Sequence, residues 1–358
     1  MAPRAGQRRE VGRCTRKERI SKMPKEITLD HGSGGEASQE LIGEIFLKRL
    51  NNRYLNRLDD SALVDISGQG VAMTTDSYVV DPIFFPGGDI GSLAIHGTVN
   101  DLAMQGAKPL YLTLGLILEE GLSMETLETI VASVGQAARE AGVKVVAGDT
   151  KVVEKGHMDK IFINTAGIGT VEPGVEVGVG NAQVGDQVLI NGHIGDHGIT
   201  ILTQREGLQF KSPLISDSAP LNWLVSAMLG DHAQGIHVLR DPTRGGVATA
   251  LNETAGRSGV GITLFEDRLP VSKPVRAASE VLGLDPLYVA NEGKCLVFVR
   301  PEDVDAVLTI MKRNKYGKDA RIIGEVTAEN PGKVLLKTRV GGTRILSMLS
   351  GEQLPRIC

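Results

Sequence analysis

Two hydrophobic periods alternate along the chain. In the first, apolar residues recur every three or four positions, which predicts helices over residues 89–106, 123–142, 245–259 and 301–314. In the second, apolar residues alternate with others or form short runs, which predicts strands over residues 70–77, 110–118, 143–149, 160–171, 186–194, 261–265, 294–299, 320–327 and 332–337. Strands that alternate with helices are typical of an α/β or α+β fold.

A change in composition divides this pattern into two units. Pro and Gly punctuate residues 170–185, TVEPGVEVGVGNAQVG, which is the best candidate for a domain boundary. A chain of 358 residues is long enough for two cores. We therefore expect one mixed α/β domain over residues 23–172 and a second over residues 173–338. Residues 339–358 have little pattern, so we expect a flexible tail that ends at Cys358.

The first 22 residues and the composition narrow the class of protein. Residues 1–22 are rich in Arg and Lys, have no apolar period and lack the hydrophobic segment of a secretory signal, so we expect a disordered extension. The net charge of -4 gives no general attraction to nucleic acid or anionic membranes, and no apolar run is long enough to cross a bilayer. Three cysteines, Cys14, Cys295 and Cys358, are not a disulfide framework and favour a reducing, cytoplasmic setting.

Glycines and acidic residues supply the candidate chemistry. The run Gly32-Ser33-Gly34-Gly35 exposes backbone N–H groups that can hold phosphate oxygens, although most such runs are turns and no Walker A lysine follows. A series of aspartates lies in loop-like contexts, where each alone is more often a cap or turn residue: Asp59, Asp60, Asp76, Asp101, Asp149 and Asp241. Several carboxylates around a glycine-rich anion site are what a magnesium–ATP pocket requires.

Three further residues have both an ordinary and a functional interpretation. Lys151 in GDTKVV and Glu292 in VANEGK are either a surface lysine and a turn acid, or groups that act on a reacting atom. Cys358 is either an incidental thiol or a group that reaches another site. Spacing alone does not decide between these interpretations.

Several motifs, in order along the chain, resemble one enzyme superfamily. LDHGSGG, LDDSALV, TTDSYVVDPIFFPGGDIGSLAIHGTVNDLAMQGAKP, GDTKV, LRDPTRGG and ANEGK together are similar to the ATP-binding superfamily of aminoimidazole ribonucleotide synthetase, selenophosphate synthetase and thiamine monophosphate kinase. Within it, the resemblance over about residues 25–358 is closest to the HypE family, the carbamoyl dehydratases of nickel–iron hydrogenase maturation. That family also ends in PRIC or a near variant, as this chain does.

The resemblance implies a fold and a set of site residues. It implies two α/β domains of the aminoimidazole ribonucleotide synthetase type, a homodimer formed by the N-terminal halves, and ATP near that interface. Four residues match the family's magnesium–phosphate positions: Asp60, Asp76, Asp101 and Asp241. Two more, Asn100 and Asp149, match positions near the nucleotide, together with the glycine-rich run. Lys151 and Glu292 match residues that meet the terminal cysteine.

The resemblance also implies a reaction and its partners. A carbamoyltransferase, HypF, places a carbamoyl group on the sulfur of Cys358. ATP-dependent dehydration turns this group into a thiocyanate, whose cyanide passes to iron on a HypC–HypD scaffold. One alternative is a related small-molecule kinase or a selenophosphate synthetase, although the latter carries a cysteine or selenocysteine near its glycine-rich loop and this chain has none there. Another is a non-enzymatic carrier that binds nucleotide and presents Cys358.

Overall fold

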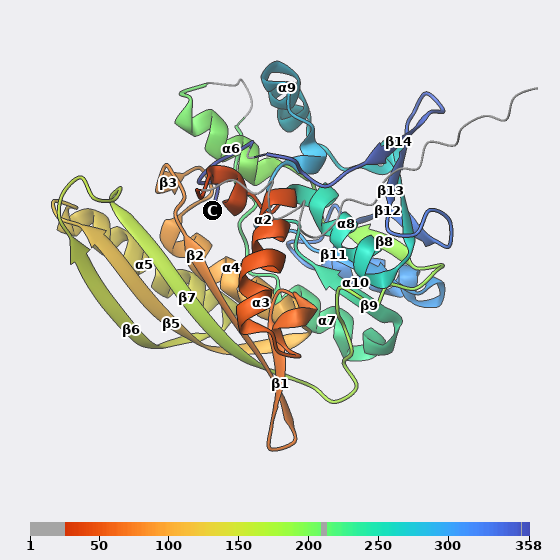
Figure 1. Ribbon diagram of the computed structural model, residues 1–358, viewed down its shortest axis with the longest axis horizontal. Helices are drawn as coiled ribbons and strands as arrows, with labels where there is room; N and C mark the ends of the chain where they lie inside the picture. The colour runs from red at the N-terminus through yellow and green to blue at the C-terminus, as the bar shows by residue number, and fades with distance from the viewer. Residues whose placement is uncertain (1–25, 209–212, 352) are drawn as a thin grey trace, which may run out of the picture.

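The computed structural model describes residues 26–208, 213–351 and 353–358, and the extension expected over residues 1–22 lies outside them. The first described elements form a helical segment that crosses the front of the molecule in Figure 1. These elements are η1 (Leu29–Gly32), α2 (Glu36–Leu41), the π-helical turn η2 (Ile42–Phe46), α3 (Leu47–Leu50) and η3 (Leu55–Arg57). Within the described residues, no helix combines the length and apolarity needed to cross a bilayer.

The first domain is built on a five-stranded sheet with the order β1-β2-β7-β5-β6. Its strands are β1 (Ala62–Ile66), β2 (Gln69–Tyr78), β5 (Ala107–Glu119), β6 (Lys144–Val153) and β7 (Ile161–Val171). β5 and β6 pair in parallel, and the other neighbours pair antiparallel. The helices α4 (Ile90–Met104) and α5 (Met124–Ala141) cover one face of this sheet, and the ribbon β3 (Phe84–Phe85) with β4 (Gly88–Asp89) precedes α4 (Figure 1).

Local sequence explains where these two helices begin and end. Asp89 caps α4 by accepting a hydrogen bond from the Gly91 N–H at 2.7 Å. Ser123 caps α5 by accepting one from the Thr126 N–H at 3.1 Å, and Gly142 ends this helix with a φ of 73°. Both helices were expected from the apolar period, and both are confirmed.

The second domain contains a seven-stranded mixed sheet with the order β14-β13-β10-β12-β8-β11-β9. Its strands are β8 (Gln187–Ile190), β9 (Ile236–Arg240), β10 (Gly261–Phe265), β11 (Leu296–Val299), β12 (Arg321–Thr327), β13 (Val334–Lys337) and β14 (Thr343–Leu346). Its helices are α6 (Asp196–Arg205), α7 (Asn222–His232), α8 (Gly246–Ser258), α9 (Lys273–Leu282) and α10 (Val304–Arg313). Short turns, η4 (Ala233–Gly235), η5 (Glu266–Arg268), η6 (Pro286–Tyr288) and η7 (Pro301–Asp303), link them. Two mixed sheets with flanking helices confirm the predicted α/β (α+β) class.

One hydrophobic core joins the two domains. Ile90 and Ile163 of the first domain belong to the same buried cluster as Val289 of the second. The tail residues Leu354 and Ile357 also belong to it. Burying a leucine or isoleucine side chain such as these contributes about 1.5–3 kcal/mol to stability. The contacts of Leu354 and Ile357 therefore favour one arrangement of the two domains and the C-terminus.

The last twenty residues differ from the flexible, patternless tail expected from the sequence. Thr343–Leu346 form β14, which pairs antiparallel with β13. Leu349, Leu354 and Ile357 are at most 6% exposed. Their apolar spacing is irregular because they pack on a surface assembled from distant parts of the chain, and local periodicity carries no sign of such a surface. The tail is therefore packed in this structure, and its movement remains a prediction.

Candidate active site

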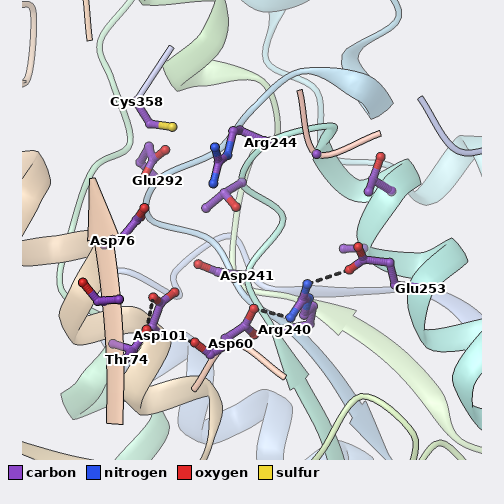
Figure 2. A pocket seen from close by; sticks show the side chains of 16 residues that line it. Asp60, Thr74, Asp76, Asp101, Arg240, Asp241, Arg244, Glu253, Glu292 and Cys358 are labelled. Atoms are coloured by element: carbon purple, nitrogen blue, oxygen red, sulfur yellow. Dashed lines mark hydrogen bonds and ion pairs between the residues drawn. The ribbon is translucent and has the colours of Figure 1, made fainter. Parts of the chain in front are cut away.

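A cavity of about 240 Å³ is lined by residues of both domains (Figure 2). The first domain contributes the segment before β1, strand β2 and helix α4. The second contributes the loop after β9, helix α8 and the loop before β11. Cys358, the last residue of the chain, lies at one end, and Asp60 lies toward the other. Residues that are far apart in the sequence therefore share one enclosed space.

Three aspartates form an acidic cluster at the end of the cavity away from Cys358. Oxygen atoms of Asp60, Asp101 and Asp241 all lie within 4.8 Å of one another. The Thr74 hydroxyl donates a hydrogen bond of 2.8 Å to Asp101. Burial, followed by repulsion from the neighbouring carboxylates, raises the pKa of Asp101 well above its usual range. Converging, partly desolvated carboxylates of this kind fit Mg²⁺, which prefers hard oxygen ligands.

Arg240, at the end of β9, partly balances this acidic cluster. It forms ion pairs with Asp60 and with Glu253 of α8, the latter at 2.6 Å. Burial raises the pKa of Asp60 and of Asp241, and Arg240 opposes that rise in both. With repulsion from Asp76 added, the pKa of Asp241 still rises to about 6. The cluster therefore keeps an affinity for a further cation.

The other end of the cavity brings Glu292 and Arg244 next to Cys358 (Figure 2). Glu292 is 3% exposed, and its Oε1 atom has no hydrogen-bond partner among the described residues. Burial, with repulsion from Asp241 and Asp76, raises the pKa of Glu292 well above its usual range. A carboxyl group of raised pKa in a cavity is suited to move protons near neutral pH.

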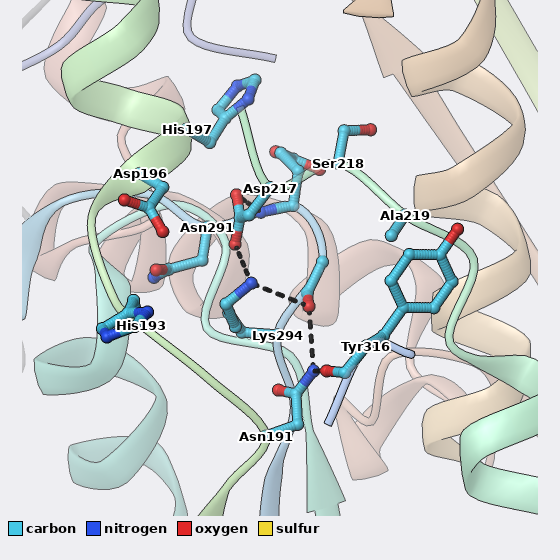
Figure 3. Close-up of polar contacts among 12 residues, drawn as sticks. Asn191, His193, Asp196, His197, Asp217, Ser218, Ala219, Asn291, Lys294 and Tyr316 are labelled. Atoms are coloured by element: carbon cyan, nitrogen blue, oxygen red, sulfur yellow. Dashed lines mark hydrogen bonds and ion pairs between the residues drawn. The ribbon is translucent and has the colours of Figure 1, made fainter. Parts of the chain in front are cut away.

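A buried polar network fixes the loop that carries Glu292 (Figure 3). Asp217 accepts a hydrogen bond of 3.1 Å from the Glu292 N–H, and its other oxygen lies 3.0 Å from the Lys294 ammonium. Burial is the largest influence and raises the pKa of Asp217, but Lys294, His197 and the Glu292 N–H together outweigh it and lower the pKa, so Asp217 stays charged. Asn191 donates to the Gly293 carbonyl at 3.1 Å and accepts from the Cys295 N–H at 2.8 Å. These contacts fix the backbone of the loop from which the Glu292 side chain extends into the cavity.

Backbone hydrogen bonds hold the tail against the first domain. The Val79 N–H donates to a main-chain oxygen of Cys358 at 2.9 Å, and the Asp81 N–H donates to the carbonyl oxygen of Arg356 at 3.2 Å. His197 Nε2 lies 2.8 Å from the Ile357 carbonyl, which can only accept, so this nitrogen carries the proton. Burial lowers the pKa of His197, which keeps the imidazole neutral and able to serve as this single donor.

Two arginines complete the attachment of the tail. Arg205 of α6 donates hydrogen bonds to the carbonyl oxygens of Pro355 at 2.7 Å and Arg356 at 2.8 Å. The Arg356 side chain donates in turn to the Val79 carbonyl at 2.9 Å and to Asp159 at 2.7 Å. These bonds satisfy the backbone of the tail and place the last residue at the cavity.

The glycine-rich run contacts the site and the tail. Gly34 lines the cavity with a φ of 77°, and a Cβ added there would lie 3.0 Å from the Cβ of Arg244. A Cβ on Gly35 would lie 2.2 Å from the Leu349 carbonyl, to which the Glu36 N–H donates at 3.0 Å. Glycine is required here for close backbone approach, while phosphate binding by Gly32, Ser33, Gly34 and Gly35 remains a prediction.

Besides Gly32, Ser33 and Gly35, three further predicted site residues do not line the cavity of this chain. Asn100 is buried and uses its amide to donate to the Ala219 and Glu292 carbonyls, at 3.0 and 3.2 Å. Asp149 and Lys151 lie on β6, about 70% exposed, and form an ion pair of 2.5 Å with each other. Asn100 therefore supports the Glu292 loop in this structure, and the roles expected for Asp149 and Lys151 remain predictions. Sequence reasoning missed Arg240 and Arg244, although both flank Asp241 in the motif LRDPTRGG.

The comparisons with known proteins match both domains of the chain. Residues 58–171 match the N-terminal domain of the AIR synthase related proteins, and residues 183–337 match their C-terminal domain. The carbamoyl dehydratase HypE of Azotobacter vinelandii is 52% identical over 332 residues, which are 93% of this chain and 97% of that protein. The chain belongs to the HypE family of carbamoyl dehydratases. The HypE of Escherichia coli K12 is 47% identical over 337 residues, 93% of this chain and 99% of its own.

Solved structures of the HypE family resemble this fold closely. The chain in a HypE–HypF complex has a TM-score of 0.83 and 51% identity, and the match covers 86% of this chain and 99% of that one. A HypE in complex with ATP has a TM-score of 0.79 and 52% identity, with 93% and 100% covered. The thiamine monophosphate kinase of Aquifex aeolicus, 21% identical with a TM-score of 0.63, shares the fold.

Proposed function

We propose that this chain removes the elements of water from a carbamoyl group carried on Cys358, in a reaction that consumes ATP. The product is a thiocyanate on the same sulfur, which supplies cyanide for the iron of a nickel–iron hydrogenase. The observation that carries the proposal is the position of Cys358, which lies at one end of a cavity that also contains Glu292 and a cluster of three aspartates.

ATP is needed because an amide oxygen is a very poor leaving group. The carbamoyl oxygen forms a bond to the γ-phosphorus of ATP, and the bond to the ADP oxygen breaks with its electron pair. Loss of one N–H proton leaves a carbon–nitrogen double bond. Loss of the second N–H proton gives the triple bond, while the carbon–oxygen bond breaks with its pair to phosphate. In total, carbamoyl and ATP become thiocyanate, ADP, phosphate and one proton.

The residues of the cavity divide this chemistry between them. Glu292 takes a nitrogen-bound proton, because its carboxyl is adjacent to the tail and has a raised pKa. Asp60, Asp101 and Asp241 would hold Mg²⁺, which neutralises charge on the phosphate oxygens when it is bound. Asp76 lines the cavity between these two groups and is a candidate for the same cation. Cys358 and the aspartate cluster line the same cavity, as a reaction between a triphosphate and the tail requires.

Three partners follow from this reaction. HypF is proposed as the donor that carbamoylates Cys358, and the similarity of this chain to the one in a HypE–HypF complex supports this proposal. A HypC–HypD scaffold that carries iron is proposed as the cyanide acceptor. Cys358 is 8% exposed in the docked position, so the tail must leave the cavity to meet either partner. The three sparse cysteines favour a reducing compartment, so the cytoplasm is the proposed setting.

A homodimer through the first domain would complete the set of site residues. β6 is exposed along nearly all of its length, and its valines include Val146 at 59% and Val152 at 66% exposure. An exposed apolar edge strand is normally covered by a partner. A second copy seated on this strand would bury the valines and bring Asp149 and Lys151 to a subunit interface. Lys151 would then act near the phosphate of the neighbouring site.

The mass of the C-terminal peptide tests the proposed function. Protein carbamoylated at Cys358, either by HypF or by cyanate, should lose the mass of one water after MgATP is added, and ADP should form in equal amount. Glu292→Gln is expected to keep the carbamoyl mass after the same treatment. ATP consumption with no change in peptide mass would favour a related kinase, and nucleotide binding with neither change would favour a carrier.

A further inference from the structure

We propose that Arg244 is a further catalytic residue of this dehydration, whose guanidinium binds the phosphoryl group as it passes to the carbamoyl oxygen on Cys358. This inference rests on the proposed function. Arg244 belongs to the loop between β9 and α8, and it lines the cavity on the side of Cys358 and Glu292 (Figure 2). No role was expected for it from the sequence.

Of the two arginines that line the cavity, Arg244 is the one whose guanidinium can bind a ligand. Six carboxylates line the cavity: Asp60, Asp76, Asp101, Asp241, Glu253 and Glu292. Arg240 is engaged by two of them in ion pairs. Within the described residues, Arg244 forms no ion pair with any of these six carboxylates, and its side chain makes one weak hydrogen bond of 3.3 Å to the Gly32 carbonyl; its strongest charge attraction is to Cys358. A triphosphate entering so acidic a space needs cations, and Arg244 is the one that the cavity lining presents at the Cys358 end.

The backbone around Arg244 is tightly packed, while its side chain is exposed. Gly245 and Gly246 follow it with φ values of 73° and 61°, and a Cβ on Gly246 would lie 2.6 Å from the Leu287 carbonyl. On the other side, Gly34 packs against its Cβ. The side chain itself remains exposed toward the cavity. Attraction to Cys358, the largest contribution, and to Asp76 raises the pKa of Arg244, so the guanidinium is charged.

This position suits the place where charge moves during the reaction. The acidic cluster, which would hold the cation, lies at one end of the cavity, and the tail lies at the other. The transferring phosphoryl group must lie between them, where Arg244 can donate two parallel hydrogen bonds to its oxygens. The same bonds stabilise the phosphate as it leaves the carbon. Arg244 donates no proton in either step, so the atom and charge balance of the reaction is unchanged.

A single-turnover experiment tests the role of Arg244. Cys358 is carbamoylated with cyanate in the full-length protein, MgATP is added to saturation, and the loss of one water from the C-terminal peptide is followed in time. Arg244→Ala should slow this step by about 100-fold, as expected for removal of a preorganised donor to a transition state. Arg244→Lys, or added guanidinium ion with Arg244→Ala, should recover part of the rate. Arg313→Ala, an exposed arginine at the end of α10, is the matched control and should react as the unmodified protein does.

Each outcome separates this inference from the proposed function. If the unmodified protein fails to lose water, the proposed function fails whatever Arg244 does. If it reacts and Arg244→Ala reacts within about threefold of it at saturating MgATP, Arg244 is not catalytic, even where ATP affinity has fallen. If Arg244→Ala is slow and neither lysine nor guanidinium recovers any rate, the loss comes from a disturbed loop and the inference fails.

Discussion

Removing Arg205 tests how the tail is held at the cavity. Its two hydrogen bonds to the tail reach the carbonyl oxygens of Pro355 and Arg356, at 2.7 and 2.8 Å. A bond from a charged donor is worth about 1.5–3 kcal/mol when fully buried, and Arg205 is only partly buried, so about 1 kcal/mol each is a reasonable value. Arg205→Ala then loses about 2 kcal/mol of docking free energy. Since about 1.4 kcal/mol is tenfold, the released fraction of the tail should rise about 30-fold.

Alkylation of Cys358 measures this released fraction. In the docked tail the residue is 8% exposed, so iodoacetamide reacts through the released state and the rate reports its population. Arg205→Ala should therefore raise the alkylation rate of the C-terminal peptide about 30-fold. Cys295 is fully buried, and burial raises its pKa to about 12, so it should stay unlabelled while the fold is intact.

The matched control for this experiment is Arg276→Ala, an exposed arginine of α9. It should leave the alkylation rate of Cys358 unchanged. If Arg205→Ala also leaves the rate unchanged, the two hydrogen bonds do not hold the tail, and the reasoning from their geometry is wrong. A rise in Cys295 labelling together with Cys358 labelling would instead report global unfolding.

Three further predictions follow from the site and the sheet. Asp101→Asn should weaken MgATP binding by at least about tenfold in calorimetry without lowering thermal stability, and an unchanged affinity would place the cation elsewhere. In the metal-free protein the pKa of Asp241 rises from 3.8 to about 6, chiefly through burial, so the folded carboxyl binds protons more tightly than the unfolded one. The free energy of unfolding should therefore fall as the pH rises from 3.8 to about 6, and Asp241→Asn should make this fall less steep in urea titrations. An equally steep fall in the variant and the unmodified protein would contradict the raised pKa of Asp241. Val146→Asp should produce a monomer in sedimentation experiments, and a retained dimer would exclude β6 as the interface.

The sequence predicted the elements of the fold better than their assembly. Helix caps at Asp89 and Ser123 and the strand periods are local, so they can be found without a structure. The packed tail cannot be found in this way, because Leu354 and Ile357 contact a core made by both domains. The attachment of the tail depends on Arg205, which no motif distinguishes from a surface arginine.

The candidate site was predicted in part for the same reason. Asp60, Asp76, Asp101, Asp241 and Glu292 were identified through motifs, and all five line the cavity together with Cys358. The role proposed for Arg244 could not be predicted from the sequence. It depends on the balance of charges in the cavity, which is known only when the positions of all the carboxylates are known. The exposure of β6 was not predicted either, because its run of valines is also typical of a buried strand.

The fate of the carbamoyl oxygen tests the central claim most directly. Cys358 is carbamoylated with a group that carries oxygen-18, unlabelled MgATP is added in ordinary water, and the inorganic phosphate is examined by mass spectrometry. If the oxygen of the carbamoyl group attacks the γ-phosphorus in this cavity, each phosphate released with a thiocyanate should contain one oxygen-18 atom. Unlabelled phosphate, with the heavy oxygen found in water, would contradict the account.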